Sequence, residues 1–236
     1  MANEIETASN ENIGFAKRLV GVFLSPTTTF NAVKKQPNWV VPLIVLLVIS
    51  LAMTIALKPV IISEQTTKTI EKLEERGMNQ EQIDEAVQKS QQFMNVSIYA
   101  FAVVGTFVVL LIGSLIWLFV SNTIMGGENK FAQLMGVNVY RYFIPTLGGI
   151  IKLPIMLSQK TLNVHFSLAA FMADASKDTF LYKMLMQVEV FNVWSIVVLC
   201  LGIAAVGNHN VKKVWPWVVG IYLAWYLITS GLSGLF

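Results

Sequence analysis

The chain has 236 residues, of which 55% are hydrophobic and 13% are charged, and its formal net charge at pH 7 is +3. Soluble domains carry about a quarter charged residues, so this composition excludes an ordinary soluble domain and favours a polytopic membrane protein. The small net charge gives no indication of nucleic acid binding. A single cysteine, Cys200, excludes both an internal disulfide and a cysteine-based zinc cluster.

The N-terminal part of the chain predicts a tail followed by two short amphipathic helices. Residues 1–12 are polar and predict a disordered tail, while residues 13–236 are predicted to form a single membrane domain. Apolar side chains recur at helical spacing within residues 14–36. The two helices are expected to lie in the membrane interface, and the alternative is that they pack on the protein's own bundle. The residues expected at the interface are Lys17, Arg18, Lys34, Lys35 and Trp39.

Five apolar segments then follow, each long enough to cross a bilayer or most of it at about 1.5 Å of rise per residue. Together they predict an all-α polytopic helical membrane protein with about five transmembrane helices. The expected spans cover residues 39–57, 96–120, 133–157, 185–206 and 214–234.

The segment between the first two spans, residues 63–94, is polar and rich in charges of both signs. It predicts an extramembrane helical hairpin divided at Gly77, because glycine is favoured just past the end of a helix. Asn79 can cap the second helix, with Gln82 three residues further on. The hairpin is expected either to stand off the membrane or to continue the first two spans as helical extensions.

The third span differs from the others because it carries charges and helix-breaking residues. Arg141 and Lys152 are costly in hydrocarbon, so this span is predicted to be shielded by its neighbours. Its prolines and its glycine pair predict that the helix is broken. The expected break positions are Pro145, Gly148, Gly149 and Pro154.

Five spans place the two termini on opposite sides of the membrane. Basic pairs flank spans closely at residues 34–35 and 212–213, which favours an N-terminus in the cytoplasm and a C-terminus outside. The basic residues of the 63–94 segment keep the raw charge count from deciding the orientation by itself.

Depth along the helices suggests how the charges in the spans are arranged. Lys152 lies about 28 Å from the inner end of the third span, and Glu189 lies about 25 Å from the inner end of the fourth. The matching depths predict an ion pair between these two side chains on the outer half. Arg141 lies only about 12 Å in, where it is expected to snorkel or to meet backbone carbonyls freed around Pro145. The three charges form a candidate intramembrane polar site, and the alternative is that they only orient the helices.

Motifs of catalysis and cofactor binding are absent from the sequence. It contains no HExxH, no Walker loop, no GxSxG and no GxGxxG after a strand. No catalytic residue, metal site or cofactor is therefore predicted.

Two segments resemble prokaryotic Yip-domain proteins. Residues 15–46 read FAKRLVGVFLSPTTTFNAVKKQPNWVVPLIVL, in which a basic amphipathic stretch leads to Ser-Pro-x-x-x-Phe and then to Pro-x-Trp-x-x-Pro at the first span. Residues 126–154 read GGENKFAQLMGVNVYRYFIPTLGGIIKLP and are similar to the third-span block of the family. The resemblance covers nearly the whole chain and implies a five-span α-helical protein with its N-terminus in the cytoplasm.

The family also has eukaryotic members, which are associated with Golgi and endoplasmic-reticulum vesicle transport and with Rab-type GTPases. Their long N-terminal region and the acidic-Leu-Tyr-Gly-Pro motif near the first span are missing here. The resemblance therefore implies the prokaryotic branch and the cytoplasmic membrane, with a Golgi or endoplasmic-reticulum membrane as the alternative.

Two functions are expected from these features. The first is a non-enzymatic membrane protein of the Yip type, an adaptor or membrane-organising factor that contacts the lipid bilayer and either a membrane-protein partner or a second copy. The alternative is a transporter or lipid-handling protein with a polar site in the broken third span. A polar cavity reaching the middle of the membrane would favour the alternative, and a tightly packed dry bundle would favour the first.

Overall fold

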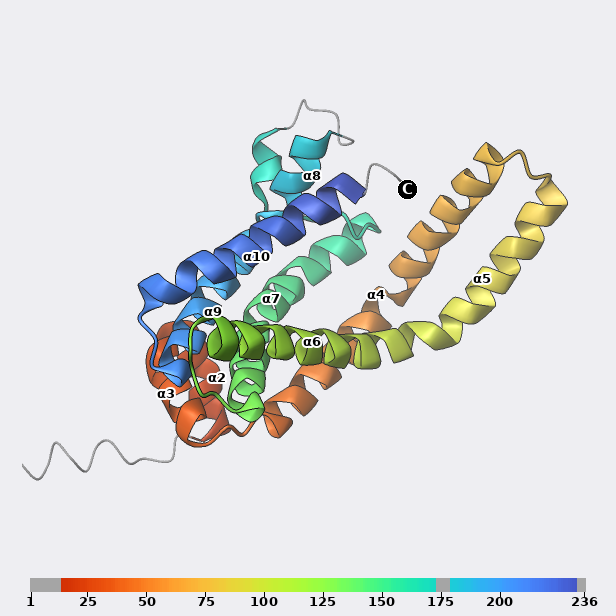
Figure 1. The fold of residues 1–236 in the computed structure, drawn as a ribbon. Coiled ribbons are helices and arrows are strands. Elements are labelled where there is room, and N and C mark those ends of the chain that lie inside the picture. The colour runs from red at the N-terminus through yellow and green to blue at the C-terminus, as the bar shows by residue number, and fades with distance from the viewer. Residues whose placement is uncertain (1–13, 173–178, 233–236) are drawn as a thin grey trace, which may run out of the picture.

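A computed structural model describes residues 14–172 and 179–232, and each element named in these ranges is a helix (Figure 1). The expected all-α polytopic membrane protein is confirmed. The helices are α2 (Phe15–Leu24), α3 (Pro26–Lys35), α4 (Val40–Glu75), α5 (Gln80–Ala100), η1 (Phe101–Gly105), α6 (Thr106–Phe119), η2 (Val120–Ile124), α7 (Phe131–Gln159), η3 (Leu168–Phe171), α8 (Phe180–Gln187), α9 (Val190–Gly207) and α10 (Val211–Leu232).

Helices α2 and α3 pack on the bundle, which is one of the two arrangements expected for them. Val22, Phe30 and Val33 are fully buried. Phe30 and Val33 lie against two glycines, Gly202 of α9 and Gly136 of α7, where any side chain would collide with them. The absence of a Cβ therefore lets α3 approach both helices closely. A place for this pair in the membrane interface remains a prediction.

Arg18, one of the residues expected at the membrane interface, has a buried side chain. Its side chain is only 3% exposed, and its Nη1 donates a 2.7 Å hydrogen bond to the carbonyl of Gln36 at the end of α3. A cation at this position complements the negative end of the α3 dipole, which explains why the arginine turns inward. Lys17 and Lys35 are exposed, and Lys34 donates to the side-chain oxygen of Asn208 in the α9–α10 connection.

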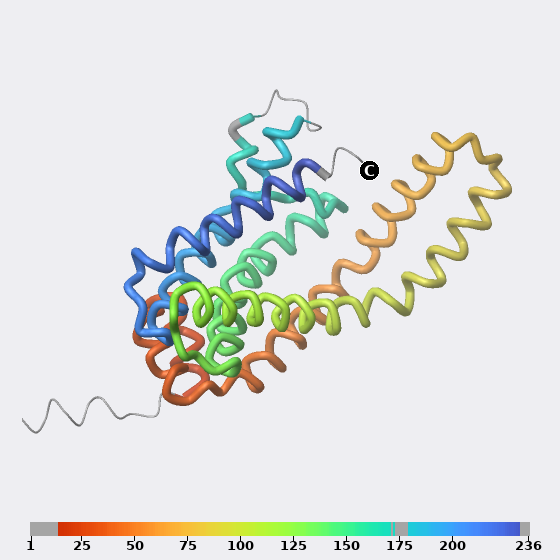
Figure 2. The backbone as a smooth tube through the Cα atoms, in the orientation of Figure 1, coloured from red at the N-terminus to blue at the C-terminus, as the bar shows by residue number. Residues whose placement is uncertain are grey.

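The helix of the first span continues beyond residue 57, because α4 runs without interruption for 36 residues through Pro59, and the expected end of the span near residue 57 remains a prediction. On the other arm, α5, η1, α6 and η2 form one helical run, Gln80–Ile124. The 63–94 hairpin thus consists of helical extensions of the first two spans, which was one of its two expected forms. Figure 2 shows this pair of arms reaching away from the other helices.

The turn of the hairpin has the chemistry that the sequence predicts. Gly77 adopts a positive φ of 71°, and the Asn79 side chain accepts from the backbone N–H of Gln82 while the Gln82 side chain accepts from that of Asn79. The arms contact each other through the buried Ile83 and a hydrogen bond from Gln91 to Thr66.

Helix α7 occupies the centre of the bundle and packs against α2, α3, α4, α6 and α9. It is continuous over 29 residues with Pro145 and Pro154 inside it, so the prediction of a broken third helix is wrong. A proline removes one backbone hydrogen bond, and the surrounding helices hold the rest of the turn in place. The glycine pair serves close packing instead, since Gly148 faces Phe191 of α9 and Gly149 faces Met53 of α4.

The helix expected for the fourth span begins later than residue 185. Residues 180–187 form a separate helix, α8, and α9 starts at Val190. Glu189 therefore lies at the N-cap of α9 with extended backbone, outside the helix, and pairs through a β-bridge with Ser167. A carboxylate in front of a helix start is favoured by the helix dipole. The helix of the last span, α10, starts at Val211, three residues before the expected start of the span, and the expected end at residue 234 lies outside the described residues.

Four helical segments are long and apolar enough to cross a membrane: α4, the run Gln80–Ile124, α9 and α10. Helix α7 is not among them, because polar residues such as Asn138, Arg141 and Lys152 lower its mean hydropathy. Enclosure by other helices removes the need for α7 to be apolar all round. The number of five spans remains a prediction.

Candidate functional site

Arg141 lies near the middle of α7, about 15 Å along the helix from Phe131, and its side chain is only 7% exposed. Its guanidinium donates to three side-chain oxygens from three helices. Nη1 donates to Tyr222 Oη of α10 at 2.7 Å and to Ser195 Oγ of α9 at 3.1 Å. Nε and Nη2 donate to Asn138 Oδ1 at 3.2 and 2.9 Å.

These partners differ from the expected ones. The sequence predicts that Arg141 snorkels or meets backbone carbonyls near Pro145, and the structure instead gives it side-chain oxygens. Asn138 is held for this role by α6, because its Nδ2 donates to the carbonyl of Leu110 at 2.9 Å and to Ser114 Oγ at 3.2 Å. The amide oxygen is thereby turned toward the guanidinium.

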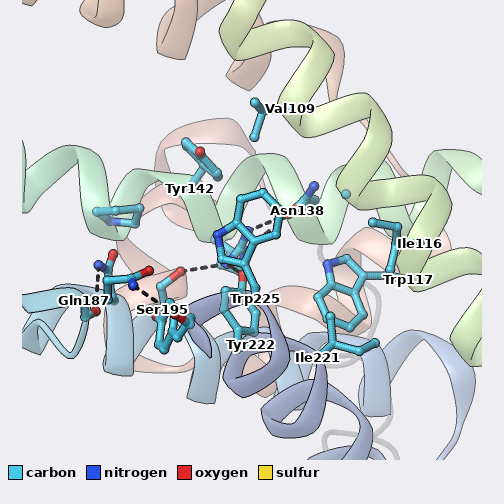
Figure 3. A pocket seen from close by; sticks show the side chains of 15 residues that line it. Val109, Ile116, Trp117, Asn138, Tyr142, Gln187, Ser195, Ile221, Tyr222 and Trp225 are labelled. Carbon is cyan, nitrogen blue, oxygen red and sulfur yellow. Dashed lines mark hydrogen bonds between the residues drawn. The ribbon is translucent and has the colours of Figure 1, made fainter. Parts of the chain in front are cut away.

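A cavity of about 450 Å³ opens beside Arg141 between α6, α7, α9 and α10 (Figure 3). This volume lies within the range of small-molecule sites. The wall is aromatic and apolar on one part and polar on another. The aromatic and apolar lining residues are Val109, Ile116, Trp117, Tyr142, Pro145, Ile221, Tyr222, Trp225 and Tyr226. The polar ones are Asn138, Arg141, Gln187, Asn192 and Ser195.

The charge of Arg141 is not neutralised by the residues that the structure describes. Within residues 14–172 and 179–232, no carboxylate lies within 4.0 Å of its guanidinium. Arginine stays protonated in proteins, so a buried guanidinium cannot escape the cost of its charge by losing a proton. The cavity is therefore electropositive.

Lys152 and Glu189 form the ion pair that their depths predict. Lys152 Nζ lies 2.7 Å from Glu189 Oε1, and the two side chains are 13% and 11% exposed. His165 lies near the pair, and burial, followed by the charge of Lys152, lowers its pKa, while Glu189 acts in the opposite direction.

A second cavity, lined by Lys152, His165 and Glu189, shares part of its wall with the first. Gln187 and Asn192 line both cavities. Gln187 is held by α10, because it donates to Ser230 Oγ at 2.7 Å and accepts from Thr229 Oγ1 at 3.0 Å. The predicted site residues therefore occupy two adjacent cavities and do not form one cluster.

Another polar group that the sequence did not predict lies at the opposite end of α9. Ser121 Oγ lies 3.2 Å from His209 Nε2 and accepts from Asn129 Nδ2 at 2.6 Å. Ser121 is fully buried, so this serine–histidine contact ties the η2–α7 connection to the α9–α10 connection. In the described ranges no group of three or more histidine, cysteine, aspartate or glutamate residues is placed to hold a metal ion.

The sequence identified Arg141, Lys152 and Glu189 but missed the neutral residues around them. Asn138, Ser195, Tyr222 and Gln187 each look ordinary in their own segment. Only Asn138 could have been found from the sequence, since it precedes Arg141 by three positions and therefore lies on the same helix face.

Comparisons with known proteins agree with this architecture. A family model for the Yip1 domain matches residues 20–235. Membrane protein YknW of Bacillus subtilis (strain 168) is 25% identical to this chain over 236 residues, which cover 98% of this chain and 97% of that protein. No solved structure matches.

The extent of the family match settles the resemblance. The match begins within α2 and ends at residue 235. It therefore includes α6, α7, α9 and α10, the helices that enclose the cavity beside Arg141. Together with the Bacillus relative and the apolar helices, it agrees with a multi-pass protein of a prokaryotic cytoplasmic membrane. The chain belongs to the Yip1-domain family of membrane proteins.

Proposed function

We propose that this Yip1-domain protein is a non-enzymatic, lipid-handling protein that holds an amphiphilic ligand in the cavity between α6, α7, α9 and α10. One observation carries the proposal, namely a buried arginine in the wall of a cavity at mid-bundle depth. A purely structural arginine is expected to be closed in by packing or matched by a carboxylate.

The lining of the cavity supports an amphiphile in particular. Polar groups gather around Arg141, while rings such as Trp117 and Trp225 form much of the remaining wall. Ligand pockets commonly combine a mostly apolar wall with a few placed polar groups. A molecule with one polar end and an apolar body matches this division.

Filling the cavity tests the proposal. Val109 lines the cavity and Val108 does not, although both are exposed side chains on α6. Val109→Trp is expected to abolish a ligand that co-purifies in mild detergent and is detected by native mass spectrometry, while Val108→Trp is expected to retain it. Equal retention in both variants, or no ligand bound to the parent protein, contradicts the proposal.

A second candidate function, an adaptor role, is favoured by a different observation. The two arms of the hairpin extend about 20 Å or more beyond the apolar segments and carry charges of both signs on exposed faces. A paired helical projection of this kind offers a surface to another protein outside the membrane.

Shortening the hairpin separates the two candidates. The hydrogen bond between Gln91 and Thr66 marks a level where the arms are adjacent, so residues 67–90 can be replaced by a short glycine-serine turn. An adaptor is expected to lose a stoichiometric protein partner in this variant while keeping its cavity ligand. The variant Glu85→Gln with Lys89→Gln removes an exposed ion pair from an intact hairpin and serves as the control.

A further inference from the structure

The hydrogen-bonding groups around Arg141 have more donors than acceptors. The guanidinium has five N–H groups, and four of them are used by Asn138, Ser195 and Tyr222. One N–H of Nη2 has no acceptor among the residues that the structure describes. All of these groups line the cavity.

The two hydroxyls add to this surplus. Ser195 Oγ and Tyr222 Oη each accept from Arg141, and each keeps its own proton to donate. In the described parts of the chain, neither hydroxyl has an acceptor for that proton. Three unused donors therefore lie close together at the positively charged guanidinium: one N–H of Arg141 in α7 and the hydroxyls of Ser195 in α9 and Tyr222 in α10. A ligand that satisfies them must supply several acceptor oxygens and a negative charge.

The surroundings of the cavity indicate where such a ligand comes from. On its rim, Val109 and Ile116 of α6 are 53% and 42% exposed, and Trp225 of α10 is 60% exposed. These side chains lie in the apolar parts of two helices that cross a membrane, so the rim faces acyl chains. Figure 3 shows α6 residues Ile116 and Trp117 facing α10 residues Ile221, Tyr222 and Trp225 across the site.

We propose that this cavity binds an anionic phospholipid, which enters from the bilayer between α6 and α10 and places its phosphate against Arg141, Ser195 and Tyr222. This inference rests on the proposed function and names its ligand. The phosphate supplies the missing negative charge and several acceptor oxygens. The acyl chains lie along the aromatic and aliphatic wall.

The experiment titrates the purified full-length protein in mild detergent with phosphatidylglycerol or with diacylglycerol of the same chains, which lacks the phosphate, and measures binding by native mass spectrometry. Arg141→Gln is expected to weaken phosphatidylglycerol binding by about 10- to 100-fold, as for the loss of a charge-assisted contact, and to leave diacylglycerol binding unchanged. Arg141→Lys retains part of the preference. Arg76→Gln changes an exposed arginine at the hairpin turn and is the matched control.

A second variant guards against misfolding of Arg141→Gln. Tyr222→Phe removes one donor and keeps the ring stacked on Trp117, and it is expected to weaken phosphatidylglycerol binding several-fold. Inorganic phosphate is tested as a competitor, because a site for free phosphate is blocked by it and a lipid site requires the acyl chains.

The outcomes separate the inference from the proposed function. A neutral lipid that is lost in Val109→Trp and retained in Arg141→Gln overturns the anionic ligand and leaves the cavity as a binding site. Competition by inorganic phosphate alone overturns the lipid source. No bound molecule in any form of the protein overturns both.

Discussion

Lys152 and Glu189 line the second cavity, and Lys152 Nζ lies 2.7 Å from Glu189 Oε1. Lys152→Met is expected to destabilise the protein by about 3 kcal/mol, because it leaves the carboxylate without its partner, and Glu189→Met is expected to do the same to the ammonium. The double variant is expected to be less destabilised than either single one. Thermal unfolding in detergent measures all three.

The two single variants and the double variant form a double-mutant cycle, in which the double variant decides whether the two charges interact. Two apolar side chains of similar volume leave no unpaired charge, so their combined effect falls below the sum of the single effects. If the stability losses of the two single variants simply add in the double variant, the two charges do not interact, and the ion pair contributes nothing to stability.

Gly148 and Gly149 make a matched comparison on adjacent positions of α7. A Cβ on Gly148 would lie 2.6 Å from the ring of Phe191, which cannot move easily, whereas a Cβ on Gly149 would meet only the terminal methyl of Met53 at 2.8 Å. Gly148→Ala is expected to cost about 1–3 kcal/mol of stability by overpacking, and Gly149→Ala close to none. Thermal unfolding distinguishes them, and equal losses would contradict the close contact between α7 and α9.

At the scale of single residues, charges were easier to predict than their partners. The Lys152–Glu189 pair followed from helix depth, which depends only on the rise per residue. The partners of Arg141 did not, because Ser195 and Tyr222 come from helices whose rotation about their axes is set by packing. The inward turn of Arg18 depends likewise on where α3 ends.

Among the elements, the extension of α4 is tied to the segment after α7 through Glu64. Its Oε1 accepts from the backbone N–H of Leu162 at 2.7 Å and from Thr161 Oγ1 at 2.9 Å. The Leu162 N–H lowers the pKa of the Glu64 carboxyl, helped by Thr161 and Lys68 and opposed by burial. This pKa is lower in the folded state than in the unfolded state. The contact therefore stabilises the fold fully at pH values above the ordinary pKa of glutamate, and this stabilisation is lost as the pH falls through the lowered pKa.

This contact predicts a local change that hydrogen exchange can measure. Glu64→Ala is expected to speed exchange of the Leu162 amide at neutral pH and to leave the rest of α7 unchanged, because only the anchoring acceptor is lost. Glu71→Ala, on an exposed position of the same helix, is the control. If both variants leave the Leu162 amide equally protected, the arm is not anchored by Glu64.

The elements were predicted well where local chemistry decides them and poorly where the surroundings do. The hairpin turn followed from Gly77 and Asn79, which act through their own backbone. The ends of α4 and the continuity of α7 did not follow from their prolines, because tertiary packing keeps a helix intact across one missing hydrogen bond. The late start of α9 at Val190 depends on the bridge that Glu189 forms with a distant segment.

At the scale of the whole molecule, the contacts between connections sort into two ends. Lys34 contacts Asn208 and Ser121 contacts His209, which gathers α3, the η2–α7 connection and the α9–α10 connection at one end. Glu64 contacts Thr161 at the other end. Helix α7 runs between these two ends, as the four apolar helical segments do, which supports its expected role as a fifth span.

Labelling of single cysteines tests the span number and the orientation together. The native Cys200 is buried and gives the unlabelled background. With the N-terminus in the cytoplasm, Glu81→Cys near the hairpin turn is expected to react with a membrane-impermeant maleimide in intact cells, since the hairpin then lies outside. Lys35→Cys and Lys212→Cys are expected to react only after permeabilisation, because both belong to the end that carries the basic pairs. The reverse pattern would invert the orientation and keep five spans. Labelling of Glu81→Cys and Lys212→Cys from the same side would remove α7 from the spans, because the two positions are separated by three crossings only if α7 is one of them.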